Sequence, residues 1–410
     1  MRVLLSTIGS RGDVQPLVAL ASELRHLGHE VRMCVPPDFR EWIDGLGIPV
    51  VPVGPGLRAA AARPADPQAP PAPPSPEQLR RAARATVAAQ FETVTAAAEG
   101  CDVIVAATAL QVAARSVAEA MGIPYVFAAY CPAVLPSPHH APPPLPVPGR
   151  PPAPETAGNR ALWARDAAHF NDMFGAALDA HRASIGLPPA GDVRGHILTD
   201  RPWLAADPTL GPWPGPDGSG VVQTGAWILP DGRPLPAELA AFLEDGEPPV
   251  CFGFGSMRVP QDLARTLIGS ARALGRRAIV LRGWAGLAPV DDGPDCLSVG
   301  EVNQQALFPK VAAVVHHGGA GTTTAAARAG TPQVVIPQVY DQHYWAQRVH
   351  RLGIGAAHPP AVPTGESLAA ALRHALRPEV ALRARAVAAR VRTDGARAAA
   401  ERLAAADPAA

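Results

Sequence analysis

Short runs of apolar residues alternate with helical patterns along the first part of the chain. Residues 2–8 are rich in Val, Leu and Ile, which is typical of a strand buried on both faces. A glycine-rich turn follows, and Pro16 stands where the first residue of a helix tolerates proline. Apolar residues then recur at helical spacing until Gly28, which predicts the helix end. Further strands are predicted at residues 30–35, 48–53, 102–107 and 125–129.

The second half of the chain repeats this pattern. Strands are predicted at residues 250–254, 278–281, 312–316 and 333–336, with helices between them, notably at 261–274 and 322–329. Strands separated by helices favour a parallel sheet with right-handed crossovers. The fold class is therefore α/β, with two doubly wound domains. We expect their join near residues 204–225, where Pro and Gly are dense.

Two further segments, residues 64–76 and 132–154, are dense in proline. Proline lacks a backbone donor and interrupts helices, so both segments are predicted to be loops. A surface linker is one interpretation. A lid or an acceptor wall is the other, since long loops inside compact α/β domains are often functional. The sequence does not decide between them.

Composition excludes several classes of function. The 410 residues include 36 Lys and Arg against 36 Asp and Glu, which gives no electrostatic reason to expect nucleic acid or an anionic membrane as a partner. The first apolar run is short for a signal peptide, and no run of about 20 apolar residues follows. We expect a soluble cytoplasmic protein without membrane insertion, either a monomer or a homodimer. The five scattered cysteines are expected to be free thiols.

The sharpest candidate for chemistry is the segment 314–323, Val-Val-His-His-Gly-Gly-Ala-Gly-Thr-Thr. A buried strand ends there, glycines open a turn, and a helix begins. Free amides at a helix N-terminus carry roughly half a positive charge and bind phosphate. A tight turn with helix capping is the alternative for the segment taken alone. A metal site from His316 and His317 is disfavoured, because neighbouring residues on a strand point to opposite faces.

The residues around this segment carry a resemblance to a known family. Downstream of His317 stand Gly330, Pro332, Pro337, Asp341 and Gln342, and this block resembles the nucleotide-sugar signature of glycosyltransferase family 1. The opening Gly-Ser-Arg-Gly-Asp-Val-Gln-Pro at residues 9–16 is similar to that of glycopeptide-antibiotic and sterol glycosyltransferases. Further blocks follow in the family's order at residues 222–227, 252–257, 282–284 and 301–303. The resemblance covers essentially the whole chain and is closest to actinomycete antibiotic-tailoring enzymes.

The resemblance implies a glycosyltransferase B-type fold, in which two Rossmann-like domains face each other across a cleft. Residues 1–210 would bind the acceptor, and residues 220–385 would bind the nucleotide sugar. Residues 386–410 would include a helix that returns towards the first domain. The implied activity is inverting, metal-independent transfer of a hexose from a UDP- or dTDP-sugar to a hydroxyl of a small hydrophobic natural-product aglycone. The nucleotide sugar is then a co-substrate, and no cofactor is expected.

The resemblance also assigns roles to individual residues. Asp13 would be the general base; a helix N-cap is the alternative role for this residue. Trp284 would stack on the donor base, and the backbone of Val302 would read the base edge. Asp341 and Gln342 would bind sugar hydroxyls. The remaining donor-binding residues, mostly around the diphosphate, would be Ser10, Arg11, Gly12, Ser256, His317, Gly319, Gly321 and Thr322.

The chain departs from the wider family at two positions, and three other functions were weighed against glycosyl transfer. Ala325 stands where plant members carry a Glu that would bind ribose, and Asp13 stands where plant and macrolide-type members carry a His. No Asp-x-Asp metal motif is present, so no metal ligand is assigned. A non-catalytic helper on the same scaffold and a nucleotide-sugar epimerase remain as alternatives. A dehydrogenase is disfavoured because no Gly-x-Gly-x-x-Gly follows the first strand.

Overall fold

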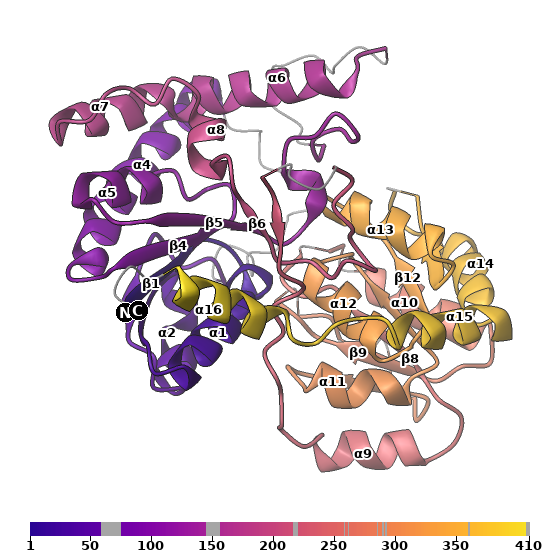
Figure 1. The fold of residues 1–410 in the computed structure, drawn as a ribbon. Coiled ribbons are helices and arrows are strands. Elements are labelled where there is room, and N and C mark those ends of the chain that lie inside the picture. The colour runs from indigo at the N-terminus through magenta and orange to yellow at the C-terminus, as the bar shows by residue number, and fades with distance from the viewer. Residues whose placement is uncertain are drawn as a thin grey trace.

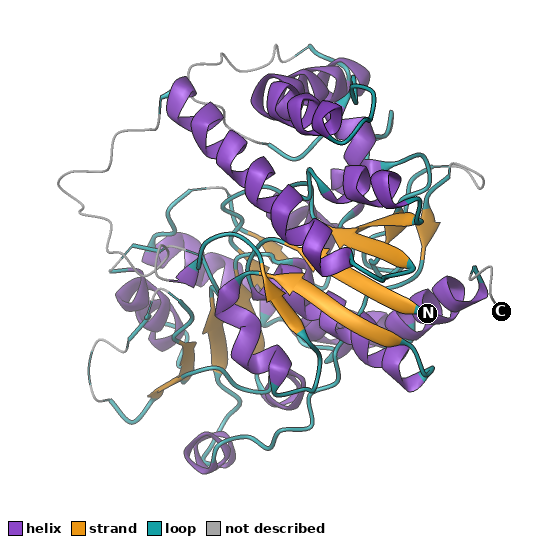
Figure 2. Ribbon diagram, turned by 90° about the vertical axis from the view of Figure 1, so that its left-hand side faces the viewer, coloured by secondary structure: helices purple, strands orange, loops and turns teal. Residues whose placement is uncertain are grey.

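The computed structural model describes residues 1–58, 75–144, 156–215, 220–257, 259–260, 262–284, 286–288, 291, 293–359 and 361–406. Two parallel sheets organise this part of the chain, and helices cover them (Figures 1 and 2). Residues 64–74 and 145–154 of the two proline-dense segments lie outside the described residues. Residues 132–144 are described: they form a short 3₁₀ turn, η2 (Pro132–Val134), and a loop in which the His140 carbonyl accepts the Trp163 indole N–H. A helix starts at Pro76. The predicted roles of the two segments as lid or linker therefore stay predictions.

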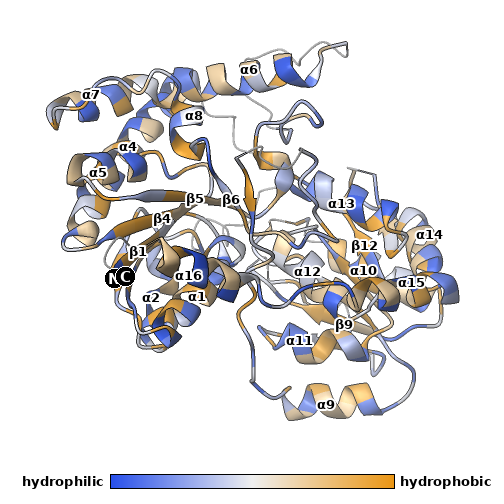
Figure 3. Cartoon of the chain, viewed as in Figure 1, coloured by the Kyte–Doolittle hydropathy of each residue, from blue (hydrophilic) through white to orange (hydrophobic). Residues whose placement is uncertain are grey.

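In the described residues, the first sheet has seven strands in the order β3-β2-β1-β4-β5-β6-β7. The strands are β1 (Arg2–Thr7), β2 (Glu30–Val35), β3 (Val50–Pro52), β4 (Val103–Ala107), β5 (Tyr125–Ala129), β6 (Trp203–Leu204) and β7 (Val222–Gln223). The central strand β4 is buried along its whole length and is coloured as hydrophobic in Figure 3. Burial on both faces explains why its residues form a continuous apolar run.

The second sheet has six strands within the described residues, in the order β10-β9-β8-β11-β12-β13. They are β8 (Val250–Gly253), β9 (Ala278–Leu281), β10 (Cys296–Val299), β11 (Ala313–His316), β12 (Gln333–Val335) and β13 (Gly355–Ala357). In each sheet the chain order reverses beside a central strand, at β1 next to β4 and at β8 next to β11. Such switch points open a crevice at the carboxyl ends of the strands, where ligands of α/β folds bind.

Helices connect the strands and bury one apolar face each. In α1, for example, Leu17, Leu20 and Leu24 are fully buried at helical spacing. The helices of the first half are α1 (Arg11–His26), α2 (Arg40–Asp44), α4 (Pro76–Ala98), α5 (Ala114–Met121), α6 (Asn159–Phe170), α7 (Ala176–Ser184) and α8 (Val193–Leu198), with the short turns η1 (Pro37–Phe39) and η3 (Asn171–Gly175).

The second half contributes a similar set of helices. They are α9 (Ala237–Glu244), α10 (Leu263–Arg272), α11 (Gln304–Leu307), α12 (Ala320–Arg328), α13 (Gln342–Arg351), α14 (Gly365–Ala375), α15 (Pro378–Ala388) and α16 (Gly395–Ala405), with the turn η4 (Phe308–Lys310). Helix α16, yellow in Figure 1, lies against α1 of the first half. Its residues Ala399, Ala400 and Leu403 belong to the same hydrophobic core as α1.

Two sequence-based expectations need correction. The first helix begins at Arg11, so Pro16 lies inside it and not at its first position. The lost backbone bond would run to Gly12 in the first helical turn, which limits the disturbance. The predicted join at residues 204–225 also falls within the first sheet, because its two ends form β6 and β7, which pair with each other. The connection between the sheets runs instead from β7 to β8.

Candidate active site at the edges of the two sheets

Asp13 lies in the first turn of α1, directly after β1 and at the switch point of the first sheet. The backbone N–H of Ser10 donates to its Oδ2 at 2.6 Å, and the Ser10 hydroxyl donates to the same oxygen at 3.2 Å. Gly9 has a φ of 150°, and a side chain there would overlap the carboxylate. In the described residues, Oδ1 has no hydrogen-bond partner in the protein. The hydrogen bonds to Oδ2 thus fix the orientation of the Asp13 carboxylate, and Oδ1 is available to a substrate.

His316 and His317 end β11 at the switch point of the second sheet and have different surroundings. His316 is fully buried, its Nε2 lies 2.9 Å from Gln333 Oε1, and its Nδ1 accepts the Gly318 N–H. It is therefore a satisfied core residue. His317 has a buried Nδ1 without a partner among the described residues. Burial lowers the pKa of His317 to about 4, so the ring is neutral at pH 7 and can donate one hydrogen bond.

The turn after His317 leads into α12, whose N-cap is Gly319. Gly318 has a φ of 96°, and a Cβ there would meet Val335 Cγ1 at 2.7 Å, so only glycine fits. Gly321 has open space around it, and the half-buried Thr322 makes no hydrogen bond to the described protein atoms through its hydroxyl. The first amides of α12 therefore face a space that an anion can enter.

The turn after β8 adjoins this anion-binding position. A Cβ at Gly255 would lie 3.3 Å from Cε1 of His317, which places the backbone before Ser256 beside the histidine ring. Ser256 itself is half-buried. The Trp284 N–H donates to Gly255 O at 2.8 Å, so the turns after β8 and β9 are joined. The structure therefore brings Ser256, His317 and Trp284 to one edge of the second sheet.

Asp341 and Gln342 stand at the start of α13, but their side chains differ in how many hydrogen bonds they already make. Asp341 is half-buried, and its Oδ2 accepts the Trp345 indole N–H at 3.2 Å. The Gln342 amide oxygen accepts the N–H groups of residues 338 and 339, and its Nε2 lies 3.3 Å from Met257 Sδ. Gln342 therefore holds the preceding loop, whereas the Asp341 carboxylate has capacity to bind a hydroxyl.

The remaining predicted donor residues lie where the two halves meet. Arg11 Nη2 lies 3.1 Å from Glu301 Oε1, so this ion pair joins the first turn of α1 to the residue before Val302. Val302 is buried, and Gly12 is exposed beside Asp13. The ring of Trp284 packs against Phe39 of η1, with centroids 6.3 Å apart.

Asp13 and Asp341 come from different sheets and influence each other's charge state. Burial raises the pKa of Asp13 to about 6, partly opposed by the hydrogen bonds from Ser10. Burial and, to a smaller extent, the negative charge of Asp13 together raise the pKa of Asp341 to about 7. The two carboxylates therefore share one electrostatic environment between the sheets.

Two contact residues in this region were missed from the sequence. The Tyr130 hydroxyl donates to the backbone carbonyl of Asp13 at 3.0 Å, and Phe39 contacts Trp284. Glu301, which pairs with Arg11, lies in the block at residues 301–303 but received no role from the sequence. The positions of Tyr130 and Phe39 depend on which loops the two sheets bring together, so no local spacing or motif could have indicated them.

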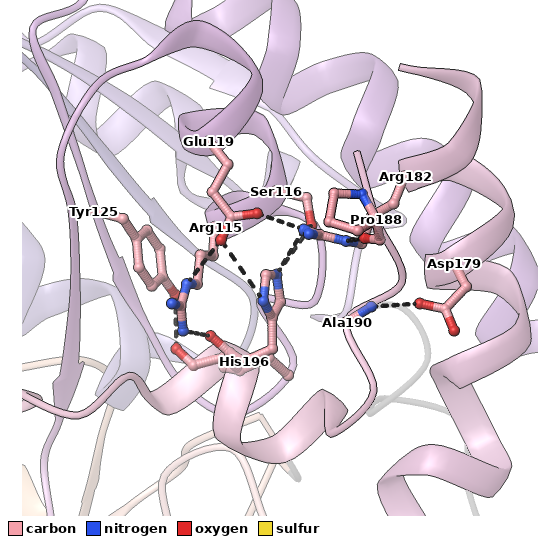
Figure 4. Close-up of polar contacts among 10 residues, drawn as sticks. Arg115, Ser116, Glu119, Tyr125, Asp179, Arg182, Pro188, Ala190 and His196 are labelled. Carbon is pink, nitrogen blue, oxygen red and sulfur yellow. Dashed lines mark hydrogen bonds and ion pairs between the residues drawn. The ribbon is translucent and has the colours of Figure 1, made fainter. Parts of the chain in front are cut away.

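A second polar cluster, in the first half of the chain, superficially resembles a hydrolase triad (Figure 4). Ser116 Oγ lies 3.0 Å from His196 Nε2, and His196 Nδ1 lies 3.9 Å from Glu119 Oε1. However, Ser116 is fully buried, and Arg182 Nη1 donates to its hydroxyl at 2.8 Å. Since no substrate carbonyl can reach Ser116 there, the cluster serves to hold α5, α7 and α8 together.

Among the described residues, the helices are too short or too polar to cross a membrane.

Comparison with protein families matches residues 3–137 to the glycosyltransferase family 28 N-terminal domain. Residues 282–403 match the C-terminal domain of proteins like erythromycin biosynthesis protein CIII. The thymidine diphosphate complex of the Streptomyces sp. SF2575 glycosyltransferase SsfS6 shares the fold, with a TM-score of 0.66, 22% identity and coverage of 99% of this chain and 100% of that one.

Two curated relatives from Amycolatopsis orientalis match over nearly the whole length. The glycosyltransferase GtfE is 54% identical, over 98% of this chain and 97% of its own. A vancomycin aglycone glucosyltransferase is 52% identical, with the same coverage of both chains. Identity at this level over nearly the whole chain confirms the resemblance expected from the sequence. The two parallel sheets and the likeness to solved antibiotic glycosyltransferases confirm the glycosyltransferase B-type fold. The chain belongs to the antibiotic-biosynthesis glycosyltransferases and is an enzyme of that family.

Proposed function

We propose that this glycosyltransferase moves a hexose from a UDP- or dTDP-sugar to a hydroxyl of a hydrophobic glycopeptide aglycone, with inversion and without a catalytic metal. The carrying observation is the ion pair between Arg11 and Glu301, which joins the first turn of α1, where Asp13 lies, to the second half of the chain at 3.1 Å. The acceptor class is supported by the name of the relative that is 52% identical. That likeness also favours a transferase over a helper protein or an epimerase. The proposed division gives acceptor binding to the first sheet, which ends at β7, and donor binding to the second sheet, with residues 386–410 returning to the first half.

The second sheet supplies the donor half of this proposal. The free amides at the start of α12, with Gly319, Gly321 and the Thr322 hydroxyl, would bind the diphosphate oxygens. Ser256 and the His317 ring, whose Nε2 lies beside Gly319, would add side-chain contacts. These dipoles are fixed before the substrate arrives, and such groups can stabilise a leaving diphosphate by several kcal/mol. A bound diphosphate would also raise the pKa of His317 and strengthen its hydrogen bond.

The remaining donor contacts would select the base and the sugar. Trp284 would stack on the base, and the backbone of Val302 would read its edge. Ser10, Arg11 and Gly12 would cover the donor from the first half of the chain. Asp341 would accept hydrogen bonds from sugar hydroxyls, and Gln342 would shape the loop beside them and offer its amide N–H. A site built around such hydroxyls disfavours sugars that lack them.

Asp13 would perform the proton transfer. Its free Oδ1 would take the proton of the acceptor hydroxyl as the acceptor oxygen bonds to the anomeric carbon. The bond from that carbon to the diphosphate breaks on the opposite face, and the diphosphate departs with the electron pair. An α-linked donor therefore yields a β-glycoside. General base catalysis of this kind contributes about 10²–10⁴-fold.

The test combines product analysis with a substitution. Mass spectrometry of the protein with UDP- and dTDP-hexoses and glycopeptide aglycones should show a hexose added to the aglycone, with and without EDTA. Asp13→Asn should lower kcat by about 100-fold or more, with donor affinity and melting temperature close to wild type. Wild-type kcat should rise with pH through about 6, because the base form of Asp13 is required.

The controls separate a base from a helix cap. Asp13→Asn should lower the kcat for a phenolic acceptor, whose hydroxyl is already acidic, less than the kcat for an aliphatic alcohol. A variant that loses stability but keeps its turnover would assign Asp13 a structural role only. Loss of all activity in EDTA, restored by Mg²⁺ or Mn²⁺, would contradict the metal-independent mechanism.

A further inference from the structure

An aromatic contact between the two halves of the chain has no role in the mechanism above. Phe39 ends η1, which follows β2, and Trp284 follows β9. The two ring centroids lie 6.3 Å apart, and the planes are inclined by only 28°. Phe39 is 5% exposed and belongs to the core under α1, against which Trp284 packs from the other side. The faces of two rings from different sheets are thus nearly parallel.

Both rings are held by their surroundings. The Trp284 N–H is bonded to Gly255 O, which fixes its turn to the turn after β8. The edge of Phe39 packs against Trp42, with centroids 6.5 Å apart and an interplanar angle of 72°. The Arg11 guanidinium carbon lies 3.5 Å from the centre of the Trp42 ring. The Phe39 ring is therefore held in place by its packing against Trp42, which Arg11 covers in turn.

The ring separation is close to what a stacked base requires. Bases stack at about 3.4 Å per layer, so a base between two aromatic faces needs about 7 Å. The ring centroids are 6.3 Å apart, so the two rings would have to move apart to admit a base. The ion pair between Arg11 and Glu301 lies in the same region and can fix how far the walls separate, because Arg11 is also bonded to Gln15 at 2.9 Å.

We propose that Phe39 is the second wall of the base site, so that the pyrimidine of the donor lies between Trp284 and Phe39. This inference rests on the proposed donor role of Trp284. The first half of the chain then contributes directly to donor binding. Arg11 and Asp13 share the first turn of α1. Binding of a base between the rings is therefore coupled to the helical turn that carries the catalytic carboxylate.

Calorimetry with dTDP and with inorganic pyrophosphate tests this inference. Phe39→Leu should weaken dTDP binding by about fivefold or more, because one stacking face is lost, and should leave pyrophosphate binding unchanged. Phe39→Tyr keeps the ring and should bind dTDP like wild type. Phe127→Leu is the matched control, since Phe127 is a buried phenylalanine in the separate core under α4.

Trp284→Leu separates this inference from the proposed function. Weaker dTDP binding in Trp284→Leu but not in Phe39→Leu would overturn the role of Phe39 and leave the donor site intact. Equal losses of dTDP and pyrophosphate binding in Phe39→Leu would also overturn it, as a structural effect. Should Phe39→Leu fail to fold, wild-type protein with labelled phenylalanine rings provides a second measurement. An NOE from the dTDP base to one ring, absent in Phe39→Tyr, supports the inference, and its absence in wild type overturns it.

Discussion

Asp341 is a carboxylate whose surroundings oppose its charge. Its pKa is raised to about 7 by burial and by Asp13, far above the ordinary value near 3.8. The folded state therefore holds a proton that the unfolded chain releases between about pH 4 and pH 7. Folding stability contributed by this group is complete below pH 4 and is lost as the pH rises through 7. Asp13 likewise contributes folding stability that is lost as the pH rises, over a narrower pH range that ends near 6.

Asp341→Asn should accordingly stabilise the protein in alkaline solution. The amide keeps an acceptor for the Trp345 indole N–H and carries no charge. We expect a higher melting temperature at pH 8, by roughly 2–4 °C for each kcal/mol of relieved repulsion, and no difference at pH 4. Turnover should fall, because the proposed sugar contact is weakened. A melting temperature raised equally at both pH values would show that charge is not the cause.

Among the elements, the position of α16 depends on close contact between its own first residue and the backbone of the segment after β7. It begins at Gly395, where a Cβ would overlap backbone atoms of Gly225 and Ala226. Ala399 and Leu403, further along the helix, pack into the core shared with α1. A side chain at Gly395 would therefore push the whole helix away from α1, since the neighbouring backbone has no flexible end that can move aside.

Gly395→Ala should lower the free energy of unfolding by about 1–3 kcal/mol or more, the usual range for overpacking. Gly365→Ala is the matched control, because Gly365 is likewise the first residue of a helix and has open space around it. That control should be neutral or more stable by about 0.4–1 kcal/mol. Urea denaturation of both variants measures the difference. Equal stability of the two variants would mean that α16 adjusts its position freely.

For the whole molecule, Asp207 joins segments far apart in the sequence. It is buried after β6, and its Oδ1 accepts the N–H groups of Thr209 and Leu210. Its Oδ2 accepts the Arg392 N–H at 2.8 Å, in the segment before α16. From the second half, Arg348 of α13 donates to the carbonyls of residues 209 and 210. One carboxylate thus helps to hold both sheets and the returning helix in place.

Asp207→Asn should cost about 1–3 kcal/mol of stability, because an amide N–H replaces the acceptor that faces Arg392. Asp207→Ala should cost more, since it leaves the backbone N–H groups of Thr209, Leu210 and Arg392 without their partner. Asp245→Asn, an exposed substitution at the end of α9, is the control and should have no effect. Thermal unfolding measures the series. The assignment would be contradicted by Asp207→Ala unfolding at the temperature of the control.

Local pattern was sufficient for the longer elements of the fold. β2, β5 and β9 have the predicted bounds, and β1, β4, β8, β11 and β12 differ by one or two residues at their ends. Continuous burial in a parallel sheet leaves an unmistakable apolar run. The strands β6, β7, β10 and β13 were not predicted. β6 and β7 have only two residues each, and the sequences Cys-Leu-Ser-Val of β10 and Gly-Ala-Ala of β13 lack a continuous run of large apolar residues. Pro16 was misplaced because the contact of Ser10 with Asp13 starts α1 earlier than the proline position suggests.

The α/β class, the two-sheet organisation and the family follow from the sequence, because strand runs, the glycine turn and motif spacing are local properties of the chain. Packing of the folded chain makes His316 a core residue and leaves Nδ1 of His317 without a hydrogen-bond partner among the described residues. Packing also brings Asp13 and Asp341 into one electrostatic environment and sets Phe39 against Trp284. Burial, pKa and contacts across the sheets depend on neighbours distant in sequence, and these exist only once both sheets are packed together.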